Sequence, residues 1–216
     1  MLVQEDNRQP IKILERNSLH KAFPTGRSVY FFFKRITDLL LSLCAIICIL
    51  SWLLPILAIL IKVDSKGPVF FLQKRTGKGG HIFTCYKLRT MVLNPYADTR
   101  PAIPDDPRTT RIGKFLRRSN LDELPQFLNI LLGSMSLIGP RPHMIYDCNR
   151  FASLIPGYAF RNLVRPGLTG LAQVKGFHGP VLNKSSCYIR YEWDAFYVRN
   201  ANYLLDLRIL RETIKL

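Results

Sequence analysis

The sequence predicts an α+β chain that is mainly helical, carries a small β-hairpin and is held in a membrane. Three observations predict this class: an uncharged stretch over residues 39–61, two short aromatic stretches around a glycine-rich turn, and helical periodicity beyond residue 110. The chain has 216 residues and is 48% hydrophobic, which excludes a disordered protein and suits one domain with a substantial core.

The apolar stretch reads LLLSLCAIICILSWLLPILAILI and, as one straight helix, is long enough to cross about 30 Å of hydrocarbon. It begins too far from Met1 for an ordinary secretory signal, and no small-residue cleavage site follows it, so we interpret it as retained. A buried helix of a soluble protein is the weaker interpretation, because such a helix usually has a polar face. The stretch is therefore a membrane element.

Its topology is left open by the residues alone. Basic residues flank both ends, so the positive-inside rule favours neither orientation of a simple crossing. Pro55 cannot donate to the carbonyl of Ser51 and predicts a kink, where the Ser51 hydroxyl, a neighbouring helix or water would serve the freed carbonyl. A kinked crossing and a re-entrant hairpin that leaves on the side it entered both fit.

We divide the chain into an unassigned arm (1–28), a membrane helix-break-helix (29–67) and a third segment (68–216). In the third segment, residues 68–74 and 81–88 predict a β-hairpin, and four prolines over 94–110 predict an extended loop. The glycines at 76–80 lack the Gly-Lys-Ser/Thr ending of a phosphate loop. Helices are expected at 111–118, 121–132, 143–154 and 186–215.

The charge balance points to phosphate-rich partners. The chain has 31 Lys+Arg against 15 Asp+Glu, a net charge of +16, which suits nucleic acid, anionic lipid or phosphorylated substrates. Between Lys62 and Arg118, directly after the apolar stretch, there are 13 basic and 4 acidic residues, which favours anionic membrane lipids. No nucleic-acid fold motif is present, so nucleic acid is not expected. Five cysteines without a Cys-x-x-Cys pair argue for a reducing compartment and against structural zinc.

Two adjacent carboxylates, Asp122 and Glu123, follow a run of cations over 111–118. Ser119 and Asp122 have the spacing of a capping box, which is the structural interpretation. The chemical interpretation is that a carboxylate among cations stays ionised, binds Mg²⁺ and attacks a phosphoryl group whose charge the arginines neutralise. Both remain open on this segment alone.

Two later segments could hold phosphate. Arg141 lies between two prolines, so its backbone is pre-organised, although a rigid turn needs no ligand. The turn-rich segment 165–176 has Arg165 and Lys175 at its ends and could bring backbone N–H groups close to an anion.

Several motifs occur in order, and together they resemble the bacterial sugar transferases, the monotopic phosphoglycosyl transferases that begin glycan assembly on a polyprenyl phosphate. The resemblance covers about Val29 to the C-terminus and leaves the first 28 residues outside it. Besides the proline-kinked apolar stretch, it is carried by residues 86–91 (YKLRTM), 122–126 (DELPQ), 139–142 (GPRP), 165–170 (RPGLTG) and the closing residues Trp193-Asp194, Tyr197-Val198 and Leu205-Asp206-Leu207.

The resemblance implies a bacterial enzyme at the cytoplasmic face of the inner membrane, with a re-entrant membrane helix over 29–67, interfacial amphipathic helices and a catalytic domain on the cytosolic face over 68–216. It would move a sugar-1-phosphate from a UDP-sugar to undecaprenyl phosphate in exopolysaccharide, O-antigen or glycoconjugate assembly, and would release UMP. Asp122 would be the nucleophile that forms a covalent phosphosugar, with Glu123 beside it and Mg²⁺ held by both. Five cations would hold substrate phosphates: Lys87, Arg89, Arg117, Arg141 and Arg165.

Two departures from the family pattern stand out. Leu54, where members often have serine, precedes Pro55, and Ser51 is the nearest serine. The loop Lys175–Gly179, with His178, replaces the Asn-Gly-Arg of many members, so the sugar is not predicted. A homodimer is left open. The rival hypotheses are a membrane-tethered anion-binding protein and an integral transferase or phosphohydrolase with a true crossing.

Overall fold

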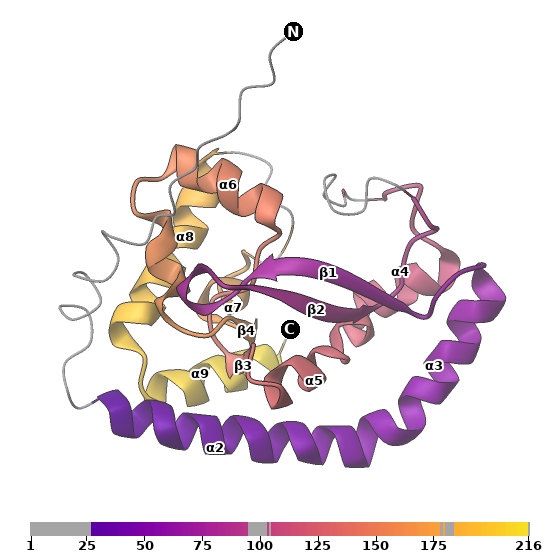
Figure 1. The fold of residues 1–216 in the computed structure, drawn as a ribbon, viewed down its shortest axis with the longest axis horizontal. Helices are drawn as coiled ribbons and strands as arrows, with labels where there is room; N and C mark the ends of the chain where they lie inside the picture. Colours follow the sequence, from indigo (N-terminus) through magenta and orange to yellow (C-terminus); the bar gives the residue numbers. More distant parts are fainter. Residues whose placement is uncertain (1–26, 95–102, 104, 178, 180–183, 216) are drawn as a thin grey trace, which may run out of the picture.

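The computed structural model describes residues 27–94, 103, 105–177, 179 and 184–215, and Figure 1 shows their arrangement. Helices and two small sheets alternate along the chain, and the first helical run borders the rest of the molecule. The helices are α2 (Arg27–Ala45), α3 (Ser51–Asp64), α4 (Arg111–Arg118), α5 (Gln126–Leu131), α6 (Ile145–Leu154), α7 (Leu171–Val174), α8 (Lys184–Asn200) and α9 (Tyr203–Thr213). The strands are β1 (Phe70–Thr76), β2 (Ile82–Leu88), β3 (Ser136–Ile138) and β4 (Gly167–Thr169).

The apolar stretch is helical throughout but changes direction. A π-helical segment, Ile46–Leu50, joins α2 to α3, and Figure 1 shows α3 turning away from the line of α2. Pro55 lies inside α3, and the Ser51 hydroxyl donates to the Ile47 carbonyl oxygen at 2.6 Å. The departure from regular α-helix therefore begins upstream of Pro55, where wider π-helical spacing and a serine hydroxyl accommodate the bend.

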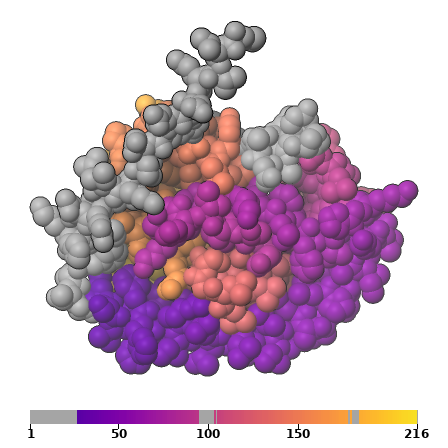
Figure 2. All heavy atoms as spheres, viewed as in Figure 1, coloured from indigo at the N-terminus to yellow at the C-terminus, as the bar shows by residue number. Residues whose placement is uncertain are grey.

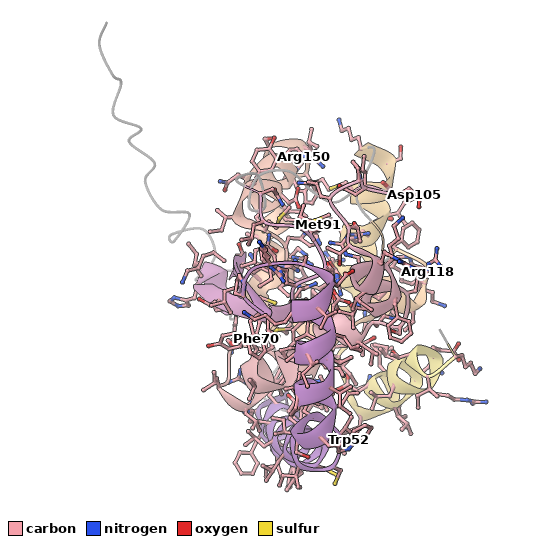
Figure 3. All side chains as sticks on the ribbon, turned by 90° about the vertical axis from the view of Figure 1, so that its right-hand side faces the viewer. Trp52, Phe70, Met91, Asp105, Arg118 and Arg150 are labelled. Atoms are coloured by element: carbon pink, nitrogen blue, oxygen red, sulfur yellow. The ribbon has the colours of Figure 1, made fainter. Side chains whose placement is uncertain are left out.

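The run Arg27–Asp64 is long and apolar enough to cross a membrane, yet only 17% of its most apolar stretch is buried. Such exposure argues against the core helix of a soluble protein. In Figure 2 the atoms of α2 and α3 form the lower and right margins of the molecule. Seen from the α3 side, Trp52 lies at one end of that helix, while Asp105, Arg118 and Arg150 lie toward the other (Figure 3).

The predicted β-hairpin is confirmed. β1 and β2 pair antiparallel from Phe70 opposite Leu88 to Thr76 opposite Ile82, and a short 3-10 turn, Lys78–Gly80, closes them. The second sheet, in which β3 and β4 run parallel, was not predicted, because both strands have three residues and lie in glycine-rich segments that were interpreted as turns. A Cβ at Gly139 would meet the backbone oxygen of Arg165, so only glycine allows this close approach.

The helix at 111–118 is confirmed by α4, and that at 143–154 by α6. Two predicted helices are interrupted. The expected helix at 121–132 is a 3-10 turn, Leu121–Glu123, followed by α5 after Pro125, and the expected helix at 186–215 breaks at Ala201 and Asn202. The Asn202 side chain accepts from the Leu205 backbone N–H at 2.9 Å and caps the new helix α9. The main core lies among α2, α5, β3, α8 and α9, with Ile130, Val198 and Ile209 fully buried.

Candidate active site

The acidic pair lies on a tight reversal after α4. The Thr110 hydroxyl caps α4 by accepting from the Gly113 N–H, and after its last residue Arg118 the chain turns through Asn120 in the left-handed conformation, with φ 55°. The capping-box interpretation is wrong, because the Ser119 hydroxyl donates backward to the carbonyl oxygens of Phe115 and Leu116. The 3-10 turn Leu121–Glu123 then directs Asp122 and Glu123 toward β2 and the segment after β3, and both side chains are mostly buried.

Glu123 is held by two cations from different elements. Lys87 of β2 donates to Glu123 Oε1 at 2.5 Å, and Arg141 donates through Nη1 to Oε2 at 2.9 Å and through Nη2 to Oε1. Burial alone would raise the pKa of Glu123, but Arg141 and Lys87 outweigh it and hold that pKa well below its usual range. Glu123 is therefore an ionised anchor that fixes both cations.

Asp122 is placed differently although it is the preceding residue. Its side chain is buried, and within the described parts of the chain no hydrogen bond or ion pair engages its carboxylate. Burial raises its pKa, the charge of Glu123 raises it further, and the cations Lys87, Arg117 and Arg141 oppose the rise. Asp122 is thus a carboxylate among cations with its oxygens left available.

Arg117 is the third cation, with Lys87 and Arg141, whose charge acts on Asp122. It lies in the last turn of α4, and its Nε donates to the Thr90 hydroxyl at 2.8 Å. One donor is used to fix the side chain, so the rest of the guanidinium remains for a ligand. The structure therefore brings together Asp122, Glu123, Lys87, Arg117 and Arg141, as their joint assignment to one site requires.

The other two predicted phosphate ligands, Arg89 and Arg165, form hydrogen bonds away from Asp122. Arg89 donates to the carbonyl oxygens that end α3, at 2.7 Å to Ser65 and 3.4 Å to Ile61, and also to that of Lys66. Arg165 donates through Nε to the Gly133 carbonyl oxygen at 3.0 Å. Both assignments stay predictions, while the contacts observed are those of helix-end and loop stabilisation.

The carboxylates of the site can be compared with what the expected Mg²⁺ requires of its ligands. No group of three or more His, Cys, Asp or Glu side chains with metal-site spacing occurs among the described residues. Mg²⁺ commonly takes only one or two carboxylates and fills its other positions with substrate phosphates and water. Asp122 fits that requirement, whereas both oxygens of Glu123 are already bonded to cations.

Comparison with known proteins gives a family. The model of the bacterial sugar transferase family matches residues 29–216. The chain belongs to that family.

Curated relatives in the bacterial sugar transferase family support the match. The chain is 42% identical over 183 residues to a UDP-glucose:undecaprenyl-phosphate glucose-1-phosphate transferase of Klebsiella pneumoniae, covering 84% of this chain and 39% of the relative. It is 42% identical over 209 residues to a UDP-N-acetylgalactosamine-undecaprenyl-phosphate N-acetylgalactosaminephosphotransferase of Aeromonas hydrophila, covering 96% and 48%. The exopolysaccharide production protein PSS of Rhizobium leguminosarum bv. phaseoli is also 42% identical, over 84% of this chain and 92% of that protein. The chain thus spans less than half the length of the first two relatives.

Sequence reasoning missed the residues that position Arg141 in this family member. Arg161 donates to the Arg141 carbonyl oxygen at 2.5 Å and is itself bonded through Nε to Asp194 at 2.9 Å, in a pair that is almost fully buried. Arg75 donates to the Pro142 carbonyl oxygen at 2.7 Å. Asp194 belongs to the closing motif, so its position was singled out by the sequence, but its partner is 33 residues away along the chain.

The loop expected to face the sugar is only partly described. His178 lies outside the described residues, so its contacts stay a prediction. The Lys175 ammonium lies 5.5 Å from the centre of the Trp193 ring, a cation–π contact that ties the loop's start to α8.

Proposed function

We propose that this chain is a phosphoglycosyl transferase that moves a sugar-1-phosphate from a UDP-sugar to undecaprenyl phosphate and releases UMP. One observation carries the proposal: of two adjacent carboxylates in a ring of cations, Glu123 is locked by ion pairs and Asp122 is left unbonded among the described residues. The names of the relatives supply the substrate class.

In the first step a carboxylate oxygen of Asp122 attacks the β-phosphorus of the UDP-sugar. The bond from that phosphorus to the bridging oxygen breaks, and UMP leaves with the bridging oxygen and its electron pair. In the second step a phosphate oxygen of undecaprenyl phosphate attacks the phosphorus of the aspartyl phosphosugar, and the Asp122 carboxylate leaves unchanged. Both steps bring anions together, so fixed cations lower the barrier by balancing charge.

The surrounding residues divide this work. Arg117 and Arg141 would bind phosphate oxygens, Arg141 through the donors that Glu123 leaves free, and Lys87 would offset charge on Asp122. Asp122, whose oxygens carry no bond among the described residues, would hold Mg²⁺, which supplies further positive charge to the diphosphate when bound. The raised pKa of Asp122 requires the reaction to run above it, where the carboxylate is ionised.

The chemical test compares Asp122→Asn with Asp105→Asn, a matched change at an exposed acid. UDP-glucose and UDP-N-acetylgalactosamine, with and without Mg²⁺, are tried as donors with undecaprenyl phosphate. UMP release by the wild type is expected to fall by at least about 10³-fold in Asp122→Asn and to stay unchanged in Asp105→Asn. Sugar-labelled donor alone should also leave a covalent label on wild-type protein and none on Asp122→Asn. Near-normal turnover in Asp122→Asn would remove Asp122 as nucleophile.

We also propose that the apolar run is re-entrant, at the cytoplasmic face of the inner membrane. Both of its ends contact the same folded body. At the start, Arg27 donates to the Val198 carbonyl oxygen at 3.0 Å; at the end, Asp64 accepts from the Ile112 N–H at 3.0 Å. A true crossing would put these ends on opposite sides of the bilayer and break one set of contacts.

The topology test uses single cysteines, Ser28→Cys and Ser65→Cys, in a cysteine-free background in intact cells and inverted vesicles. A membrane-impermeant thiol reagent should label both only from the cytoplasmic side. Labelling from opposite sides would support the crossing enzyme instead.

A further inference from the structure

A cavity of about 350 Å³ lies beside the start of α2 and shares no lining residue with the Asp122 site. It is bounded by α2, the hairpin turn, β3 and the segment before β4. Its lining carries five basic side chains and one acidic one: Arg27, Lys34, Arg35, Lys78, Arg165 and Asp38.

The cations of this cavity are positioned mainly by neutral groups. Arg35 donates to the carbonyl oxygens of Ile130 and Leu131 at 2.7 and 3.1 Å, and Arg165 donates to that of Gly133 at 3.0 Å. These carbonyls end α5 and carry only partial negative charge. Each guanidinium has five N–H donors, so both arginines keep donors in reserve.

The acidic groups nearby do not balance this charge. Asp206 pairs with Lys34 at 2.7 Å, and Asp38, the acid of the cavity, accepts from the Leu137 N–H at 3.0 Å. Lys78 has no ion-pair partner among the described residues. Partial desolvation lowers the pKa of Lys78, although the residue as a whole is exposed, and the neighbouring charge of Arg165 lowers that pKa further. Bringing an anion into the cavity would relieve that repulsion.

The helix that lines the cavity carries exposed apolar side chains outside the lining. On α2, Val29, Phe32 and Phe33 are 62, 64 and 51% exposed. On α9, which the Tyr30–Asp206 hydrogen bond ties to α2, Leu204 and Leu207 are 80 and 65% exposed. A cationic pocket and exposed hydrocarbon-like side chains on the same helix suit a ligand with a phosphate and an apolar tail that follows the helix surface.

We propose that this cavity binds the phosphate of an anionic membrane phospholipid, whose chains lie along the apolar faces of α2 and α9. The bound lipid holds the start of α2 at headgroup depth. This inference does not depend on the proposed nucleophile, because Asp122, Glu123, Lys87, Arg117 and Arg141 do not line the cavity. Arg165, which the family resemblance assigns to substrate phosphate, is assigned here to the lipid phosphate.

The test measures lipid retention by native mass spectrometry of the full chain released from phosphatidylcholine vesicles that contain phosphatidylglycerol. Wild-type protein is expected to retain one phosphatidylglycerol molecule. Lys78→Gln should lower that retention by about fivefold or more, the factor for one basic residue at an anionic surface. The matched control is Lys74→Gln on the same hairpin, because Lys74 is exposed as Lys78 is, bonds Thr84 at 2.8 Å and does not line the cavity. It should retain the lipid as wild type does.

Equal retention by Lys78→Gln and wild type would overturn the proposal, and so would equal losses in both variants, which would indicate diffuse surface charge. Two further arms identify the phosphate source. Inorganic phosphate that displaces phosphatidylglycerol at similar concentration would make this a free-anion site. Undecaprenyl phosphate that displaces it from wild type but not from Lys78→Gln would assign the cavity to the acceptor substrate. Either result would overturn the phospholipid assignment.

Discussion

Glu123 with Lys87 and Arg141 (the Glu123 cluster) and the cavity beside α2 both contain several cations, but different groups hold those cations in place. Lys87 and Arg141 converge on a buried carboxylate, whereas Arg35 and Arg165 converge on backbone carbonyls. A full counter-charge compensates the burial of a cation and fixes its geometry, while carbonyl dipoles leave most of the positive charge uncompensated. The first arrangement suits positioned catalytic groups, and the second suits capture of an anion from outside.

The largest expected effect comes from removing the counter-charge in the first cluster. Glu123→Gln leaves Lys87 and Arg141 buried without a carboxylate, so the free energy of unfolding should fall by about 3–5 kcal/mol. Asp38→Asn, at the cavity, keeps an oxygen acceptor for the Leu137 N–H and should cost about 1 kcal/mol. Denaturant unfolding in matched detergent measures both. Equal losses would erase the distinction between the two regions.

A smaller loss of unfolding free energy is expected at Arg161, which is bonded both to a carboxylate and to a backbone carbonyl oxygen. Arg161 bonds the Asp194 carboxylate and donates to the Arg141 carbonyl oxygen. Asp194→Asn keeps one acceptor but removes the charge, so unfolding free energy should fall by about 2 kcal/mol. UMP release should fall with it, because Arg141 loses its support. Unchanged release in protein of reduced stability would show that Arg161 does not position Arg141.

Arg117 is the cation near Asp122 whose hydrogen-bond partner among the described residues is a neutral hydroxyl. Thr90→Val removes the hydroxyl that accepts from Arg117 Nε and should cost about 1 kcal/mol of catalysis, roughly fivefold in kcat/KM. Thr84→Val, which removes the hydroxyl bonded to the exposed Lys74, is the control and should leave kcat/KM unchanged. A loss as large as that of Asp122→Asn would mean that Thr90 itself contacts the substrate.

The mildest expected change is a displacement of the pH profile. Burial raises the pKa of Asp122, with a further rise from Glu123, so UMP release should decline on the acid side above the usual aspartate range. In Glu123→Gln the like charge is gone and Lys87 and Arg141 act on Asp122 alone, which lowers the pKa of Asp122. The acid limb of the residual activity should move to lower pH. A move to higher pH would contradict the assignment of the nucleophile.

Local patterns in the sequence predicted the elements that depend on near neighbours. The apolar run, the β-hairpin and α4 follow from hydropathy, β-branched content and helical periodicity. The helix expected over 121–132 was wrong in its first turn, because Asn120 adopts a left-handed conformation and redirects the chain. The break between α8 and α9 depends on an Asn202 cap inside an otherwise helical pattern.

The candidate site was predictable in its residue types but only partly in its assembly. Asp122 with Glu123, Arg117 and Arg141 lies in motifs close along the chain, and these side chains do meet. Arg89 and Arg165 lie in motifs of equal prominence, yet they are bonded to the ends of α3 and to Gly133. An arginine that belongs to a motif can bind the carbonyl oxygens at a helix end or can bind a ligand, and the motif alone does not distinguish the two roles.

The sequence by itself determined that the chain has an apolar run long enough for a membrane element, a strongly basic character and an acidic pair among cations, because these are properties of composition and short spacing. Only the tertiary structure decided which carboxylate is locked and which is available, since the partners Lys87 and Arg141 lie 36 and 18 residues from Glu123. It also decided that Arg35 and Arg165, beside α2, are held by backbone carbonyl oxygens. Electrostatic interactions depend on the distance between two groups in space, and the number of residues between them along the chain does not predict that distance.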